Sequence, residues 1–584
     1  MLIYKKLLHL ITPTQKLELI FLSVLMFIGV LFEMLGVGII IPTLAILLNP
    51  NILVDYPKFS VILKKILGSI THDELVIIGM GILVFVYFIK TLYLIFLTWK
   101  QSIISTKISS FFSKKLFSGY LEMPYSFHLS RNSSDLIRNI QSEVNYFNSI
   151  AQSFITLTTE FSAILGIAVM LLFIEPKGAI SVSLFLFLFA FIFYRLIRNV
   201  ILKWGIERQK QEGDLARFLM EGFGSIKILK LMGKSFYFKN LFNKASEEKS
   251  VTFAKIFALQ QVPRLYIELM GVVSLSVFII SMIYLSRPID TLLPIIGVFV
   301  VAAFRLMPSI NRIIGSMQNI RSAGPVVDLL YNEFILIDNT IIIEESLVKK
   351  TFFKEIIELK NICFKYPESK KFILNQISLD IRKGDSIGLF GKSGSGKSTL
   401  VDLICGLLRP NIGEIIVDGS NINNNIRDWQ NKIGYVSQFI YLTDDTIRKN
   451  VAFGIPSEKI DNVKVDRAIE MAQLDEHIAG LPLGLNTIVG EQGVQLSGGQ
   501  RQRIGIARAL YDNPQVLILD EATSALDNKT EIEVMDSIDS IKGNITIIII
   551  AHRLSTLSHC DKIFQLDNNT IIEKNKVDLY LDKH

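Results

Sequence analysis

Six apolar runs dominate the N-terminal half of the chain. Each approaches or exceeds the roughly 20 residues that an α-helix needs to cross a bilayer, so we expect membrane spans rather than buried helices of a soluble protein. The first run is too long for a cleavable signal peptide and follows an amphipathic start at residues 1–16. The predicted spans are residues 17–48, 75–99, 153–174, 178–201, 257–285 and 291–316.

Basic residues between these runs predict the orientation of the spans. Residues 100–150 contain six Lys and Arg and residues 195–255 contain thirteen, whereas residues 175–178 and 286–290 contain one each. Because positively charged loops stay on the cytoplasmic side, we expect the two long connections and both termini in the cytoplasm. The net charge of +7 reflects this topology and requires no nucleic-acid partner.

A glycine-rich segment follows a strand pattern at residues 386–390. Backbone N–H groups of a loop between a strand and a helix surround phosphate groups, and glycines let the chain approach closely. Lys397 can reach the β- and γ-phosphates, and the Ser398 hydroxyl can ligate Mg²⁺. The predicted phosphate-binding residues are Gly391, Ser393, Gly394, Ser395, Gly396, Lys397, Ser398 and Thr399.

Further motifs accompany this loop in a definite order. The strand pattern 516–519 ends in Asp520 and Glu521, where one carboxylate can hold a metal ion and the other can accept a proton from water. The segment 496–500 precedes a helical pattern and so offers unpaired N–H groups to a phosphate. Most of these residues, taken singly, would be ordinary loop or strand-end residues. The ordered set is Tyr366, the phosphate loop, Gln438, Ser497, Gly498, Gly499, Gln500, Asp520, Glu521, Asp527 and His552.

This order resembles that of the ATP-binding-cassette (ABC) ATPases, over roughly residues 350–584. The resemblance implies that ATP and Mg²⁺ are the cofactors. It implies that Tyr366 stacks on the adenine. Ser398, Gln438 and Asp520 would hold the metal ion directly or through water.

The same resemblance implies a catalytic set and a dimer. Glu521 would be the general base, with Gln438 and His552 beside the reacting phosphate. Residues 497–500 and Asp527 would act on the ATP bound by the other subunit. Because both Glu521 and the 497–500 motif are intact, one gene can supply two competent sites, which favours a homodimer over a heterodimer.

The two long cytoplasmic connections keep helical periodicity, so we expect the membrane helices to continue into the cytoplasm. Breaks at residues 123–128 and 231–235 predict short crosswise helices that dock on the ATPase. This layout resembles the half-transporters among ABC exporters, which implies a multi-domain membrane protein: a six-helix α-helical transmembrane domain followed by an α/β P-loop ABC ATPase domain. The expected domains are an amphipathic segment at 1–16, a transmembrane domain at 17–325, a linker at 326–354 and a nucleotide-binding domain at 355–584.

Ionisable residues within the predicted spans are candidates for cargo binding, because charges inside a membrane are costly. The basic candidates are Lys90, Arg264, Arg305 and Arg312, and the acidic counterparts are Glu33, Glu160 and Glu268. Cations on several spans would suit an anionic cargo such as a pyrophosphate. Internal ion pairing is the other interpretation, for instance between Arg264 and Glu268 one helical turn apart.

Residues 57–71 place apolar side chains at helical spacing among lysines, which predicts a helix on the outer membrane surface. A helix that only packs on the transporter fits equally well. With the segments around Pro42, Arg264 and Arg305, this helix resembles the bacterial lipid-linked oligosaccharide flippases of protein glycosylation. In that family, arginines in the cavity receive the pyrophosphate. The resemblance implies an ATP-driven flippase of a polyprenyl-pyrophosphate-linked oligosaccharide in the bacterial inner membrane, in contact with membrane lipids.

Other functions stay open at this point. Within transport, the cargo could be lipid A, a drug or a peptide, because the ATPase motifs carry no information about it. From other classes, an ATP-gated channel or regulator and a repair-type ABC ATPase are alternatives. Six spans argue against the repair type, and the intact Glu521 argues against a gate that seldom hydrolyses ATP.

Overall fold

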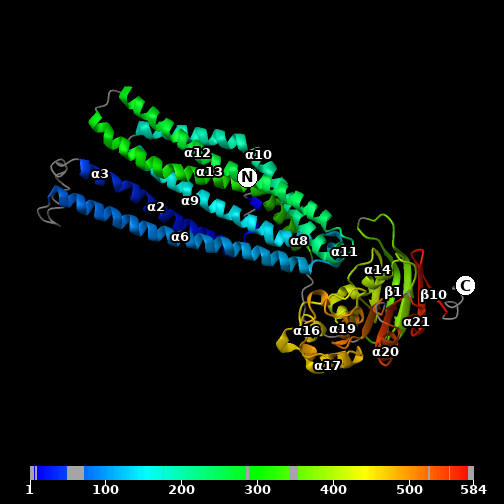
Figure 1. Ribbon diagram of the computed structural model, residues 1–584. Helices are drawn as coiled ribbons and strands as arrows, with labels where there is room; N and C mark the ends of the chain where they lie inside the picture. The colour runs from blue at the N-terminus through cyan, green and yellow to red at the C-terminus, as the bar shows by residue number, and fades with distance from the viewer. Residues whose placement is uncertain are drawn as a thin grey trace. The chain divides into compact units, whose positions relative to one another are not determined.

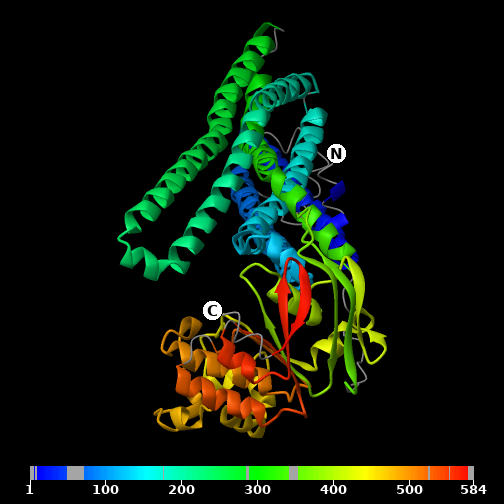
Figure 2. The same cartoon turned by 90° about the vertical axis from the view of Figure 1, so that its right-hand side faces the viewer.

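The computed structural model describes residues 5–6, 9–48, 71–174, 176–284, 289–340, 353–367, 369–523, 527–551 and 553–575. It divides into two compact units (Figures 1 and 2). The first is helical and comprises Met1–Met123 and Ser130–Ile342. The second is built of strands and helices and comprises Pro124–Leu129 and Ile343–His584.

The helical unit is built from long helices that run side by side in Figure 1. Thr12 and Gln15 form a capping box at the start of the first long helix, and Thr71 and Glu74 form another at the start of α6. The main helices are α2 (Pro13–Gly38), α3 (Ile40–Leu48), α6 (His72–Glu122), α9 (Val144–Ile174), α10 (Pro176–Gly224), α12 (Ser235–Tyr284) and α13 (Ile289–Asn339).

The first predicted span, residues 17–48, is interrupted at Ile39, where α2 ends and α3 begins. Pro42 explains the position of this break. A proline lacks the N–H group of a helical hydrogen bond, and its ring clashes with the carbonyl of the residue four positions earlier, here Gly38. The single run therefore forms two helices rather than one.

The remaining spans agree with the sequence pattern. Among the described residues, α2, α6 and the stretch Ser133–Phe173 are long and apolar enough to cross a membrane. Of the other three predicted spans, 178–201 and 291–316 lie within α10 and α13, and 257–284 of the third lies within α12; these helices have 49, 51 and 50 residues. Such helices are much longer than the roughly 20 residues needed to span a bilayer, as expected if they continue into the cytoplasm. Residues 326–339 of the expected linker belong to α13.

Short helices form at both predicted breaks. Between α6 and α9 lie α7 (Tyr125–Ser130), α8 (Ser133–Arg138) and the π-helical turn η1 (Asn139–Glu143). Between α10 and α12 lies α11 (Ile226–Leu231), followed by Gly233 with a left-handed φ of 64°. Figure 2 shows α11 at the tip that joins α10 and α12. Contacts group residues 124–129 with the α/β unit.

The α/β unit contains two sheets. A six-stranded sheet has the order β10-β9-β3-β8-β7-β6, and its strands pair in parallel except for β10 with β9. A four-stranded antiparallel sheet has the order β2-β1-β4-β5. The strands are β1 (Ile356–Phe364), β2 (Leu374–Arg382), β3 (Ser386–Phe390), β4 (Ile412–Val417), β5 (Ser420–Asn421), β6 (Ile433–Val436), β7 (Val516–Asp520), β8 (Thr546–Ile550), β9 (Lys562–Asp567) and β10 (Thr570–Lys574).

Helices cover both faces of the six-stranded sheet, so β7 and β8 are buried throughout and their sequences read as continuous apolar runs. Among the described residues that follow β1, the helices longer than four residues are α14 (Lys397–Ile404), α15 (Ile426–Gln430), α16 (Ile447–Val451), α17 (Asn462–Met471), α18 (Asp475–Ala479), α19 (Gly498–Leu510), α20 (Asn528–Asp539) and α21 (Leu554–Ser558).

Alternate residues of β7 and β8 belong to two different hydrophobic cores. Ile518 and Ile548 pack in the core that contains α14, whereas Leu519 and Ile549 pack in the core that contains α19. Successive side chains of a strand point to opposite faces of the sheet. The two helices therefore cover opposite faces of β7 and β8.

Candidate nucleotide site

The predicted phosphate loop connects β3 to α14, as expected. Gly391, Gly394 and Gly396 have φ values of 153°, 80° and 98°, a region that side chains rarely adopt. A Cβ atom at Gly391 would lie 2.3 Å from the carbonyl oxygen of Leu566. Only glycine fits this position, because the obstructing atom belongs to the backbone of β9.

Lys397 opens α14 and is buried against the loop that precedes it. Its Nζ donates hydrogen bonds to the carbonyl oxygens of Gly391 at 2.9 Å and Lys392 at 3.1 Å. Burial lowers the pKa of the ammonium group, and the nearby carboxylates of Glu521 and Asp520 oppose that shift. The predicted phosphate ligand is thus placed close to both predicted carboxylates.

Ser395 supplies a test of whether this loop fits phosphate. Its hydroxyl oxygen is buried and has no hydrogen-bond partner among the described residues. A buried polar group without a partner is costly, and a phosphate oxygen would satisfy it. Together with the glycine conformations and Lys397, this hydroxyl shows a loop that fits a phosphate group.

Asp520 lies at the carboxyl end of β7 and is buried. The Tyr435 hydroxyl on neighbouring β6 donates a hydrogen bond to Asp520 Oδ2 at 3.2 Å. Burial raises the pKa of Asp520, and the hydrogen bond from Tyr435 opposes that shift. Burial and the nearby Asp520 raise the pKa of Asp402, on α14, to about 6. Sequence reasoning missed Tyr435 and Asp402, although Asp402 stands one helical turn after Ser398.

Glu521 and Gln438 meet in the structure, as their predicted roles require. Gln438 Nε2 donates a hydrogen bond to Glu521 Oε2 at 2.7 Å. The two residues follow the neighbouring parallel strands β6 and β7, whose carboxyl ends lie at the same edge of the sheet. Glu521 has a left-handed φ of 49°, and its N–H donates to the carbonyl oxygen of Ile550 at 3.0 Å. Such a conformation costs a non-glycine residue about 1–3 kcal/mol and persists only where its surroundings enforce it.

Ser398, Gln438 and Asp520 offer a hydroxyl, an amide and a carboxylate, which are oxygen donors of the kind that Mg²⁺ prefers. The described residues contain no cluster of three or more His, Cys, Asp or Glu able to hold a metal ion. A magnesium site in an ATPase needs no such cluster, because the nucleotide phosphates and water complete the coordination. When bound, the ion neutralises charge that develops on the phosphate oxygens.

Tyr366 and Thr399 lie next to each other, with 3.2 Å between their hydroxyl oxygens. The Tyr366 ring also meets the Phe364 ring edge-on, at a centroid distance of 5.1 Å. These contacts place the predicted adenine-stacking residue beside the helix that the phosphate loop opens.

The segment 497–500 forms the expected helix N-terminus. Ser497 caps α19 by accepting a hydrogen bond from the Gln500 N–H at 3.2 Å, and Gln500 Oε1 accepts one from the Ser497 N–H at 2.8 Å. Gly498 and Gly499 begin the helix. Because α19 and α14 cover opposite faces of β7 and β8, this N-terminus and the phosphate loop belong to different parts of the chain's surface.

Of the last two predicted nucleotide-binding residues, the structure describes Asp527 but not His552. Asp527 is exposed and caps α20 by accepting a hydrogen bond from the Thr530 N–H at 3.2 Å. Hydrogen bonding by Thr530 lowers the pKa of Asp527. His552 lies outside the described residues, so its predicted contact with the γ-phosphate stays a prediction.

Three of the four predicted cargo cations are ion-paired. Lys90 Nζ lies 2.8 Å from Glu33 Oε2, and both side chains are buried, with exposed fractions of 11% and 9%. Arg264 Nε lies 3.0 Å from Glu268 Oε1 on an exposed helix face, the pairing that the spacing suggested. Arg312 Nε lies 2.7 Å from Glu160 Oε1. The side chain of Arg305 and the predicted outer helix at 57–71 lie outside the described residues.

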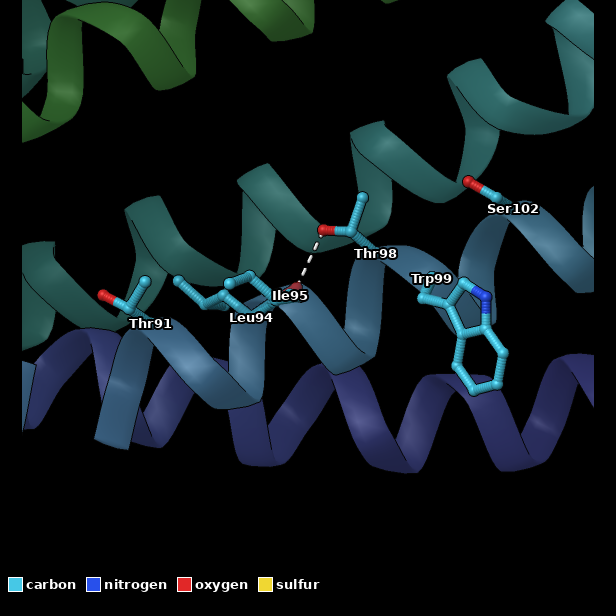
Figure 3. Close-up of a pocket in the computed structure, with 6 residues that line it drawn as sticks. All are labelled: Thr91, Leu94, Ile95, Thr98, Trp99 and Ser102. Carbon is cyan, nitrogen blue, oxygen red and sulfur yellow. Dashed lines mark hydrogen bonds between the residues drawn. The ribbon is translucent and has the colours of Figure 1, made fainter. Parts of the chain in front are cut away.

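A groove of about 460 Å³ follows one face of α6 (Figure 3). The Thr98 hydroxyl donates to the carbonyl oxygen of Leu94 within the same helix, at 2.8 Å. The groove lies in the helical unit and is separate from the nucleotide site. Its lining residues are Thr91, Leu94, Ile95, Thr98, Trp99 and Ser102.

Comparison with known proteins decides the family. Residues 56–304 match the family ABC transporter transmembrane region, and residues 374–524 match the family ABC transporter. The chain is 32% identical, over 81% of its length and 80% of the relative, to the ATP-dependent lipid A-core flippase of Cupriavidus pinatubonensis. The chain belongs to the ABC transporters.

Other relatives agree with this assignment. The ATP-dependent lipid A-core flippase of Ralstonia nicotianae is 29% identical over 82% of this chain and 80% of the relative. A putative multidrug export protein, YgaD of Bacillus subtilis, is 37% identical over 48% of each chain. The fold matches a bacterial Atm1-family ABC exporter with ATP bound, with a TM-score of 0.76, 22% identity and coverage of 95% and 96% of the two chains.

This ABC transporter is therefore a half-transporter of the exporter type, with one transmembrane region followed by one ATPase domain. The predicted fold class is confirmed, as is an ATPase coupled to transport. It is a multi-pass membrane protein with a cytoplasmic ATPase domain that binds ATP. The matched transmembrane region excludes the repair-type alternative.

Proposed function

We propose that this half-transporter uses ATP hydrolysis to flip an amphipathic lipid with a phosphorylated saccharide headgroup across the bacterial inner membrane. The observation that carries the proposal is the similarity to lipid A-core flippases, at 29–32% identity over about four-fifths of the chain. Lipid A export was an alternative at the level of sequence motifs, and the comparisons support it better than they support a polyprenyl-pyrophosphate cargo.

A polyprenyl-pyrophosphate-linked oligosaccharide remains the second candidate. Its support is the motif resemblance around Arg264 and Arg305. That support is weakened because Lys90, Arg264 and Arg312 each have a carboxylate partner. An anionic headgroup would have to displace these carboxylates before it gained full contact with the cations.

For hydrolysis, we infer that Glu521 accepts the proton of the attacking water and that Gln438 orients the Glu521 carboxylate through their 2.7 Å hydrogen bond. Lys397 and the phosphate loop would hold the nucleotide phosphates. Ser398, Gln438 and Asp520 would hold Mg²⁺. The raised pKa of Asp520 favours this role, because a bound cation compensates the cost of its buried charge.

We infer a homodimer from two features of the single chain. The N-terminus of α19 and the phosphate loop lie over opposite faces of the sheet, so one chain does not bring both to one ATP. The region around α11 also exposes large apolar side chains, with exposed fractions of 87% for Leu231 and 72% for Phe236. A patch of this kind marks an interaction site, and a second copy of the chain would cover it.

Proteoliposomes test the cargo assignment. Purified protein is reconstituted with a labelled lipid A-core, with a labelled polyprenyl-pyrophosphate oligosaccharide, or with an apolar dye. ATP-dependent movement is followed by chemical protection of the label, and the Glu521→Gln variant serves as the inactive control. We expect lipid A-core to move fastest. Faster movement of the polyprenyl lipid would reverse the order of the two candidates, and movement of the dye alone would refute both.

A further inference from the structure

Glu531 is a buried carboxylate on α20 that no predicted role includes. Its side chain is 8% exposed, and its Oε2 pairs with Arg553 Nη1 at 2.6 Å. Its Oε1 accepts hydrogen bonds from the hydroxyls of Thr556 at 2.7 Å and Thr523 at 3.3 Å. One carboxylate thus contacts two segments of the chain besides its own helix.

These segments flank the proposed catalytic base. Thr523 stands two residues after Glu521, in the segment that follows β7. Arg553 stands three residues after Ile550, the end of β8 and the acceptor of the Glu521 N–H. The Glu531 N–H itself donates to the carbonyl oxygen of Asp527 at 2.8 Å, in the first turn of α20. Glu531 therefore joins the ends of two neighbouring strands to the start of a helix.

The left-handed φ of 49° at Glu521 requires such a restraint. A strained residue keeps its conformation only when neighbouring contacts over-determine it. The backbone bond to Ile550 fixes one side of Glu521, and the contacts of Glu531 fix the segments that follow Glu521 and Ile550.

We propose that Glu531 is a positioning residue that holds the Glu521 carboxylate in place for hydrolysis, acting through Thr523 and Arg553. The inference rests on the proposed role of Glu521 as the base. Glu531 itself contacts no reacting atom, so its role in hydrolysis is to position Glu521.

The Glu531→Gln variant tests this inference. Gln keeps the size of the side chain and an acceptor for the threonine hydroxyls, but it loses the ion pair with Arg553. We expect kcat for ATP to fall roughly tenfold to a hundredfold, the range for a lost supporting contact or a small displacement of a catalytic group. KM and the nucleotide Kd should stay unchanged, because the phosphate loop packs in the other core.

Asp428→Asn is the matched control. Asp428 pairs with Lys432 at 2.6 Å and its side chain is 9% exposed, so its carboxylate is as buried as that of Glu531 at 8%. Lys432 is also 9% exposed, whereas Arg553 is 45% exposed, so the control removes the more deeply buried pair. Both variants should lose thermal stability, but only Glu531→Gln should lower kcat per folded molecule. An unchanged kcat in Glu531→Gln, or an equal fall in both variants, would overturn the inference.

Two further measurements complete the test. If Glu531→Gln does not fold, Thr556→Val removes one hydroxyl donor and should lower kcat by a smaller factor, and an unchanged kcat there would overturn the inference. In the folded case, the Glu531→Gln/Arg553→Gln double variant should have the kcat of the worse single variant, since the two side chains act as a unit. If the reductions in kcat of the two single variants multiply in the double variant, the inference is overturned. Normal hydrolysis by Glu521→Gln would instead refute the base assignment, independently of Glu531.

Discussion

Replacing Lys90 with Met is expected to destabilise the transmembrane unit rather than to abolish cargo binding selectively. The change removes the ammonium group that lies 2.8 Å from Glu33 Oε2, and the Glu33 side chain is only 9% exposed. Removing one partner of a buried ion pair costs about 3–5 kcal/mol, because the remaining buried charge loses that counter-charge. The double variant Lys90→Met/Glu33→Gln should recover most of this loss, since it leaves no buried charge.

Arg264→Ala is the matched comparison for this prediction. Arg264 and Glu268 are 66% and 53% exposed in the chain, whereas Lys90 and Glu33 are 11% and 9% exposed, so truncation of Arg264 affects a carboxylate that is less enclosed by protein. The assay is thermal unfolding of the detergent-solubilised protein, together with the flipping rate per folded molecule. Lys90→Met should lower the melting temperature clearly and Arg264→Ala should not.

One result would refute this reasoning. If Lys90→Met melts like the unmodified protein but no longer flips its cargo, then Lys90 binds the headgroup and its pair with Glu33 is exchanged during transport. A double variant as unstable as Lys90→Met would also contradict the argument, because the loss would then come from packing of the lysine chain rather than from the stranded carboxylate.

Three further predictions concern the nucleotide site. Glu521→Gln should keep nucleotide binding and lower steady-state ATP hydrolysis by roughly 10²–10⁴-fold, and near-normal turnover would exclude the residue as the base. Lys397→Ala should weaken nucleotide binding, measured by calorimetry, by about 1.5–3 kcal/mol, which is the contribution of a hydrogen bond to a charged group. Gln438→Ala should leave nucleotide affinity intact and lower transport. The reverse order of the two affinities would show that the two roles are misassigned. Gly391→Ala should abolish binding, because its Cβ would lie 2.3 Å from a backbone oxygen, and retained affinity would mean that the loop can shift.

Local chemistry made much of the nucleotide site predictable. The start of α19 follows from Ser497 and Gln500, whose reciprocal hydrogen bonds need only residues three positions apart. The phosphate loop follows from glycines between a buried strand and a helix. The meeting of Glu521 and Gln438 follows from two parallel strands that end at the same sheet edge.

Contacts between distant segments could not be predicted in this way. The pairing of Arg264 with Glu268 was foreseeable because the residues are one turn apart, but that of Lys90 with Glu33 depends on how α2 packs against α6. The contacts of Glu531 with Thr523 and Arg553 likewise require the folded sheet. The left-handed backbone at Glu521 has no signal in residue type, since glycine is the residue that usually adopts it.

The ion pairs in the helical unit limit where an anionic headgroup can bind. At Lys90 a phosphate would have to separate a buried pair, at a cost of about 3–5 kcal/mol before any gain. At Arg264 it would compete with Glu268, whose side chain is 53% exposed in the chain and is therefore less enclosed by protein than Glu33 at 9%. At Arg312 the side chain is 49% exposed and its partner Glu160 is 10% exposed, so the burial of this pair lies between those of the other two. Exchange of a carboxylate for a cargo phosphate is therefore easiest at Arg264, and loss of flipping without loss of stability should appear there before it appears at Lys90.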